Sequence, residues 1–199
     1  MTRKLLIASS NSGKIAEIKD HFKELDFQFV TPTEFDDLGE VIEDGSTLEA
    51  NALKKARDRA KKTDLLSLAD DTGLEVEYLK GKPGIHSARF AHEEATYKEN
   101  NDKLLEMLQG VPYAKRKAQF RTVVAVVDPQ KDKEYTVSGY CKGYILEERR
   151  GDRGFGYDPI FYVPEYDQTF AEMSMNLKNK ISHRADALEK MKKVLKSRY

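Results

Sequence analysis

The sequence is short of cysteine, of net charge and of long apolar runs, and each shortage excludes a class of protein. The one cysteine, Cys141, rules out an internal disulfide, and its alternating segment predicts a packed side chain rather than a nucleophile. Lys plus Arg equals Asp plus Glu at 34 each, so no overall field attracts nucleic acid or a membrane surface. No apolar run approaches the roughly 18 residues of a spanning helix, and the opening run is too short for a signal peptide. We therefore expect a cytoplasmic protein with no nucleic-acid or membrane partner.

The pattern of apolar residues predicts an α/β fold with a mixed sheet. A chain of 199 residues is long enough for one sizeable domain. Strands and helices alternate in the first part of the chain, whereas residues 118–127 and 135–146 form two long β-branched or alternating segments joined by a turn. Such a hairpin within a strand-helix alternation favours a mixed sheet over a purely parallel one.

Two adjacent carboxylates follow the apolar run 65–69, and they are the first candidate site. We interpret the run as a buried strand that ends at Asp70 and Asp71, with Thr72 next and a sharp turn at Gly73. Packed carboxylates repel unless a cation or a donor satisfies them, so a divalent metal is one explanation and a solvated Asp-rich turn is the other. Strand alternation points the two side chains to opposite faces, so only one of them should face a metal.

The loop after the first predicted strand is a candidate phosphate site. It comprises Ser9, Ser10, Asn11, Ser12, Gly13 and Lys14, and it lies where a helix begins. Free backbone N–H groups and the helix dipole favour phosphate there, and Lys14 adds a positive charge. The loop is not a P-loop, because Ala8 and Ile15 stand where that motif needs Gly and Ser or Thr. A helix cap of Ser and Asn beside an exposed Lys is the alternative.

Two further charged residues lie just before and within the second predicted helix. Ser46 and Glu49 fit a capping box that opens this helix, and Glu43 lies just before it, within reach of a metal. Lys55 shares a helix face with Asn51, which is unusual for a residue meant only for solvent. The alternative for Lys55 is a stem packed along the surface with its ammonium group in water.

The segment 149–159, named here the glycine-rich loop, places aromatic residues between glycines. Glycines let a backbone approach a ligand closely, and an aromatic ring beside them can stack on a base. A surface loop with buried aromatics is the alternative. Further along, His183 and Arg184 occupy the first turn of the last predicted helix, where cations are disfavoured unless an anionic or oxygen-rich ligand is present.

Six motifs in one order resemble the inosine triphosphate pyrophosphatase (Ham1) family. They read SSNSGK, EDGSTLEANALKKA, LADDTGLEV, GKPGIHSARFA, FGYDPIFYVP and AEMSMNLKNKISHRADAL, and they extend over nearly the whole chain. The resemblance implies an elongated mixed sheet flanked by helices, in one bilobed domain of residues 1–199 with a central cleft. It also implies a homodimer that, with Mg²⁺, hydrolyses ITP, dITP and XTP to the monophosphate and pyrophosphate, clearing deaminated purines from the nucleotide pool.

The resemblance also implies roles for single residues. Glu43 and Asp71 match the family's metal-binding acids, and Asp71 matches the acid that positions or activates water. The loop Ser9 to Lys14 matches the triphosphate loop, Lys55 and Lys178 match lysines that neutralise phosphate, and Thr72 would donate to the substrate. The run Phe155, Gly156, Tyr157 and Asp158 matches the base-binding loop, with Phe155 stacking on the purine, and His183 and Arg184 match residues that read its 6-oxo group.

One departure from the family pattern lies in the phosphate loop. The family usually has Gly where this chain has Ser10, so the residue is strained or the loop binds differently if that Gly serves a positive φ or a close approach. Two alternatives to the implied activity stay open. One is a pyrophosphatase for another modified nucleotide, and the other is a nucleotide-binding regulator that has lost turnover.

Overall fold

The computed structural model describes residues 2–199, and within that range the chain forms five α-helices and eight β-strands. The chain divides into two compact units. Unit 1 consists of the residues up to Asp71 with Thr122–Gly139 and Arg184–Tyr199, and unit 2 consists of Thr72–Arg121 and Tyr140–His183. Strands β3 (Leu66–Val76), β5 (Lys117–Asp128) and β6 (Lys133–Ile145) contribute residues to both units.

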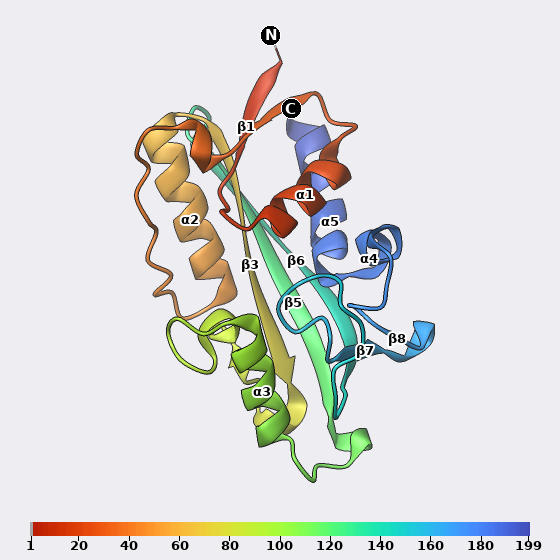
Figure 1. The fold of residues 1–199 in the computed structure, drawn as a ribbon. Coiled ribbons are helices and arrows are strands. Elements are labelled where there is room, and N and C mark those ends of the chain that lie inside the picture. The colour runs from red at the N-terminus through yellow and green to blue at the C-terminus, as the bar shows by residue number, and fades with distance from the viewer. Residues whose placement is uncertain (1) are drawn as a thin grey trace. The chain divides into compact units, whose positions relative to one another are not determined.

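The first strands of unit 1 pair in parallel, as the strand-helix alternation predicts. Strand β1 (Arg3–Ile7) pairs in parallel with β2 (Phe27–Val30) on one side and with β3 on the other. The helices are α1 (Ser12–Phe22), α2 (Leu48–Thr63) and α5 (His183–Arg198). Figure 1 shows α2 on one side of β3, and α1 and α5 on the other. Apolar residues of α1 and α5 form one core with alternate residues of β1, β3 and β5, which include Leu5, Ile7, Leu66 and Leu68.

The helix starts in unit 1 are set by side-chain caps. Asn11 caps α1, since its Oδ1 accepts from the Lys14 amide at 3.1 Å. Thr47 caps α2, since its Oγ1 accepts from the Ala50 amide at 3.0 Å. The prediction that Ser46 opens this helix is therefore wrong by one residue, because the neighbouring Thr supplies the same kind of acceptor.

Unit 2 is built on a second core. Its elements, besides parts of β3, β5 and β6, are β4 (Pro83–Gly84), α3 (Tyr97–Met107), β7 (Phe161–Val163), β8 (Gln168–Thr169) and α4 (Met175–Ile181). Strands β4 and β3, β7 and β6, and β8 and β7 pair antiparallel. The core packs Leu104 and Leu108, from and just after α3, against Phe120, Phe161 and other buried residues. Cys141 belongs to this core, as the sequence predicts.

The turn predicted at Gly73 does not exist. Strand β3 runs without a break from Leu66 to Val76, through the Asp pair and beyond it. A Cβ at position 73 would lie 2.7 Å from the carbonyl oxygen of Gly84, so Gly73 lets β4 approach β3 closely. The glycine serves a backbone contact rather than a change of direction.

The predicted fold class is confirmed as a mixed α/β structure with an open mixed sheet flanked by helices. The sheet runs in the order β2-β1-β3-β5-β6-β7-β8, with β4 paired to β3. The hairpin predicted from 118–127 and 135–146 corresponds to β5 and β6, which are neighbours in that order. Among the described residues, every helix is too short or too polar to cross a membrane.

Candidate functional site

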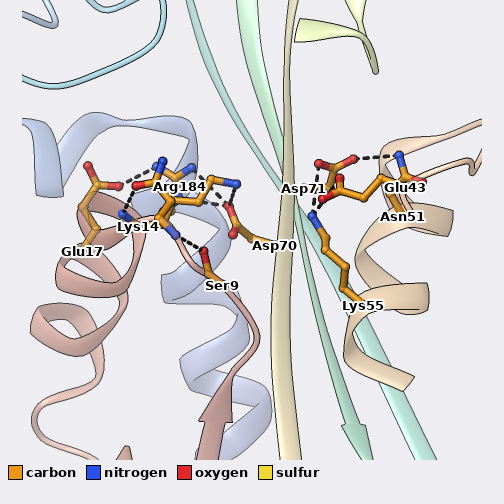
Figure 2. Close-up of polar contacts among 10 residues, drawn as sticks. Ser9, Lys14, Glu17, Glu43, Asn51, Lys55, Asp70, Asp71 and Arg184 are labelled. Atoms are coloured by element: carbon orange, nitrogen blue, oxygen red, sulfur yellow. Dashed lines mark hydrogen bonds and ion pairs between the residues drawn. The ribbon is translucent and has the colours of Figure 1, made fainter. Parts of the chain in front are cut away.

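Strand β3 separates its two adjacent carboxylates. Figure 2 shows Asp70 directed toward α1 and α5, and Asp71 directed toward α2. Both side chains are largely buried, at 3% and 8% exposure. The alternation of a strand therefore assigns each carboxylate its own set of partners, as the sequence predicts.

Asp71 belongs to a cluster with Glu43, Lys55 and Asn51. The Lys55 ammonium lies 3.1 Å from Glu43 Oε2 and 3.5 Å from Asp71 Oδ1. Asn51, one turn before Lys55 on α2, donates from Nδ2 to Asp71 Oδ2 at 3.2 Å. The Asn51 Oδ1 accepts from the Gly45 amide at 2.7 Å, which ties the segment carrying Glu43 to the same helix. Helix α2 and the loop before it thus bring one acid, Glu43, and one base, Lys55, to Asp71 on β3.

Burial and charge act against each other in this cluster. Burial raises the pKa of the Asp71 carboxyl and Glu43 adds to the rise, so the effect of Lys55 is outweighed. Burial alone would lower the pKa of Lys55, but Asp71 and Glu43 together raise it above its ordinary value. Lys55 is therefore charged at neutral pH, and it holds the two carboxylates close to one another.

The donor set of Glu43 and Asp71 fits a Mg²⁺ ion that also binds substrate. Mg²⁺ is commonly held by one or two carboxylates, with phosphate oxygens and water completing its octahedron. Within residues 2–199 no three side chains from His, Cys, Asp and Glu gather in a ready-made metal site. Two carboxylates beside an ammonium group therefore suit a metal that arrives with a phosphate ligand.

On the other face of β3, Asp70 joins a buried network of alternating charge. The Lys14 ammonium lies 3.2 Å from Asp70 Oδ2. Arg184 donates to the same oxygen from Nε and Nη2, both at 3.2 Å, and from Nη1 to Glu17 Oε2 at 2.6 Å. Arg184 is 2% exposed and Glu17 is 5% exposed. This network fixes the first turns of α1 and α5 against the strand (Figure 2).

The shifts in the pKa of Asp70 and of Lys14 show that these charges depend on one another. Burial would raise the pKa of Asp70, but Lys14 and Arg184 outweigh it and hold that pKa below its ordinary value. Burial lowers the pKa of Lys14 in spite of Asp70, so a further negative partner would stabilise the charged form of this side chain. A phosphate group is such a partner.

The candidate phosphate loop, residues 9–14, forms the entry to α1, with Ser9 before the helix and Gly13 and Lys14 in its first turn. The Ser9 hydroxyl accepts from the Asn11 amide at 3.2 Å. Ser10 is exposed. Among the described residues, the non-glycine residues with positive φ are Asp64, Lys80, Asp132 and Asp167, so Ser10 has an ordinary negative φ. Ser10 therefore occupies the place of the family's Gly without backbone strain.

Unit 2 gathers a second cluster around the glycine-rich loop. Asp158 accepts at Oδ2 from the Lys178 ammonium at 2.7 Å and from the Phe155 amide at 2.9 Å. The Lys178 ammonium also lies 4.6 Å from the centre of the Phe155 ring. One buried ion pair thus fixes both the backbone and the ring at Phe155.

The neighbouring residues of this loop are also fixed. Tyr157 is buried and donates from its hydroxyl to the Ser87 carbonyl oxygen at 2.8 Å, and burial raises its pKa. Gly156 has a φ of +63°, in the left-handed region that favours glycine. His183 stacks on Phe120 with ring centres 4.5 Å apart, and Thr72 is half-buried on β3.

The sequence-predicted residues thus fall into two groups, each within one unit. Unit 1 brings together Glu43, Lys55 and Asp71 on one face of β3, and Lys14 and Arg184 with Asp70 on the other. Unit 2 brings together Phe155, Asp158 and Lys178. Glu17 was missed, because its role depends on its pairing with Arg184, 167 residues away in the sequence.

The comparisons with known proteins agree with one another. The sequence profile of the Ham1 family matches residues 5–194. The chain is 50% identical to a protein of Thermoanaerobacter pseudethanolicus named dITP/XTP pyrophosphatase, over 98% of both chains. It is 45% identical to a Bacillus cereus protein of the same name, over 95% of this chain and 93% of that one. The solved structure of a HAM1 protein from Coxiella burnetii is 41% identical, with a TM-score of 0.90 over 98% of this chain and 99% of that one. The Ham1 protein of Staphylococcus aureus is 38% identical, with a TM-score of 0.89 over 99% and 100% of the two chains.

Proposed function

Because the chain belongs to the Ham1 family, we propose that it hydrolyses dITP, XTP and ITP to the nucleoside monophosphate and pyrophosphate. The observation that carries the proposal is the meeting of Glu43 and Asp71 at the Lys55 ammonium, in a chain so similar to dITP/XTP pyrophosphatases. Two carboxylates and an ammonium group at these distances suit a polyphosphate that arrives with a bound metal ion.

In this proposal Glu43 and Asp71 bind the metal ion, and Asp71 also acts on the attacking water. Glu43 and Asp71 would hold Mg²⁺, which makes water more acidic and neutralises charge that develops on phosphate. Asp71 orients the attacking water and accepts its proton. The water oxygen bonds to a phosphorus of the α–β linkage while the bond from that phosphorus to the bridging oxygen breaks, which separates the monophosphate from pyrophosphate.

The positive groups bind the triphosphate in this proposal. Lys14 and the amides of the loop Ser9 to Gly13 face the phosphates at the start of α1, where the helix dipole also favours an anion. Lys55 and Lys178 neutralise further phosphate charge, and Thr72 donates to the substrate.

The glycine-rich loop binds the base in this proposal. Phe155 stacks on the purine, while Gly156, Tyr157 and Asp158 shape the loop beneath it. His183 and Arg184 donate to the 6-oxo oxygen. Adenine carries an amino group there, which would face donors and lose a buried hydrogen bond, so ATP is a poor substrate.

Two features of the protein's setting are also proposals. The family resemblance supports a homodimer, which light scattering after gel filtration tests directly. A role in clearing deaminated purines supports action in the cytoplasm, where the free nucleotide pool is. Residues 1–199 would act as one bilobed domain.

The proposal is tested by product analysis with a panel of nucleotides. Purified protein with Mg²⁺ is incubated with dITP, XTP, ITP, ATP and GTP, and monophosphate and pyrophosphate are quantified. The proposal expects equal amounts of both products from the first three substrates, and a kcat/KM at least about 100-fold lower for ATP, as a lost buried hydrogen bond implies. Release of single phosphate, or equal rates for all five nucleotides, would overturn it.

A further inference from the structure

One face of α3 holds the tip of the glycine-rich loop. The Tyr97 ring lies 6.3 Å from the Phe155 ring, centre to centre. One turn further along, Asn101 donates from Nδ2 to the Gly156 carbonyl oxygen at 3.0 Å. Residues four apart lie on one helix face, so both contacts come from the same side of α3.

The same helix also anchors the start of this loop. Arg149 donates from Nη2 to Asp102 Oδ1 at 2.6 Å and to the Lys98 carbonyl oxygen at 3.1 Å. Both ends of the segment 149–156 therefore depend on α3 for their position. Asn101 supplies the inner contact, since it is 3% exposed, whereas Arg149 and Asp102 have side chains that are 35% and 47% exposed.

Asn101 is an unusual residue for a merely structural contact. Its Oδ1 is buried and has no hydrogen-bond partner within residues 2–199. A buried amide that uses only half of its hydrogen-bonding capacity is costly compared with an apolar side chain, so each such group calls for an explanation. The bond that Asn101 does make goes to the loop that carries Phe155.

The peptide after Gly156 is the part of the loop that needs this bond. Phe155 is fixed through its amide by Asp158, and Tyr157 is fixed through its hydroxyl by Ser87. Gly156 lies between them with a φ of +63° and no side chain, so its peptide can rotate at little steric cost. The bond from Asn101 to the Gly156 carbonyl is therefore a third anchor beside those at Phe155 and Tyr157, and its loss would loosen the backbone next to Phe155.

We propose that Asn101 is a positioning residue for the purine base, which acts by holding the Gly156 carbonyl so that Phe155 presents its ring. The inference rests on the proposed function, in which Phe155 stacks on the base. It predicts that Asn101 affects the base-binding part of recognition and leaves the phosphate-binding part unchanged.

The test compares ligands that contain the base with a ligand that lacks it. Asn101→Leu and Asn101→Ala both remove the donor, one with and one without a bulky side chain. The matched control is Thr96→Ala on the same helix, which removes the capping box with Glu99 but does not touch the loop. Calorimetry gives the affinity for IMP and for pyrophosphate with Mg²⁺, steady-state kinetics give kcat and KM for ITP, and urea unfolding gives stability.

Loss of one hydrogen bond should weaken IMP binding and raise the KM for ITP by about three- to tenfold in both Asn101 variants. Pyrophosphate affinity and kcat should stay within about twofold of the wild type, because no group that touches phosphate is changed. The Thr96→Ala protein should lose stability while keeping its IMP affinity.

Unchanged IMP affinity in both Asn101 variants would overturn the inference, and so would an equal loss for IMP and pyrophosphate. In either case wild-type cleavage of ITP would leave the proposed function standing. A wild-type protein that neither binds IMP nor cleaves ITP would overturn both.

Discussion

Replacing Arg184 with methionine should destabilise the protein far more than the loss of a surface charge does. Methionine keeps much of the side chain's length and apolar bulk but removes the donors that meet Asp70 and Glu17. Breaking a buried ion pair by removing one partner costs about 3 to 5 kcal/mol, because the remaining charge is left in a poorly solvating environment. Arg184, Asp70 and Glu17 are all at most 5% exposed, so that range applies here.

The cost should depend on pH in a defined direction. In the wild type the pKa of Asp70 is held below its ordinary value, so its contribution to stability is complete above about pH 4 and is lost as pH falls through the folded pKa. Without Arg184, less positive charge opposes the effect of burial on Asp70, so the pKa of its carboxyl rises, and protonation of Asp70 as the pH falls reduces the cost of the substitution. The stability gap between wild type and variant should therefore shrink from about pH 7 to about pH 5.

Urea unfolding of both proteins across this pH range measures the gap, with Arg57→Met as the matched control. Arg57 pairs with Glu134 at the surface, where the two side chains are 56% and 39% exposed, so its replacement should cost less than about 1 kcal/mol. A gap below about 1 kcal/mol for Arg184→Met at pH 7, or a gap that does not change with pH, would show that the buried network does not stabilise the fold in this way.

Three further predictions concern the thiol, the glycine-rich loop and the metal. Burial raises the pKa of Cys141 to about 12, so a thiol reagent at pH 8 should label the native protein at least about 100-fold more slowly than the urea-unfolded protein, and similar rates would contradict this. A Cβ at Gly154 would collide with Asp158 Oδ2, while one at Gly156 meets no atom within 4 Å, so Gly154→Ala should be less stable than Gly156→Ala by about 1 to 3 kcal/mol in urea unfolding, although both have positive φ. Removal of Mg²⁺ with a chelator should abolish pyrophosphate release and added Mg²⁺ should restore it, whereas release that continues in excess chelator would exclude the proposed metal role.

Much of the fold follows from local patterns in the sequence. The apolar spacing of Ile15, Ile18 and Phe22 predicts α1, and the hairpin of β5 and β6 follows from long alternating or β-branched segments. The turn at Gly73 was predicted wrongly because a glycine in a strand can mark either a bend or a close approach. Only the position of Gly84 in space decides between them.

The sequence pattern predicts which residues belong to the candidate site, but not which of them contact one another. Period-two alternation correctly assigned Asp70 and Asp71 to opposite faces, yet it could not say which face would hold Lys55. That depends on α2 lying across β3, which is a tertiary contact. The pairing of Arg184 with Glu17, 167 residues apart in the sequence, has no local signal at all.

We propose that β3 gives its adjacent carboxylates different roles, with Asp71 serving catalysis and Asp70 serving structure. The most direct test measures pyrophosphate release from XTP and urea stability for Asp71→Asn and Asp70→Asn. Burial raises the pKa of Asp71, so its charge disfavours folding, and Asp71→Asn should be as stable as the wild type while its turnover falls at least about 100-fold. Asp70→Asn should instead lose about 3 kcal/mol or more of stability, because it leaves Arg184 and Lys14 without their shared carboxylate. An Asp71→Asn protein with nearly full turnover, beside an Asp70→Asn protein as stable as the wild type, would show that β3 does not divide the two roles in this way.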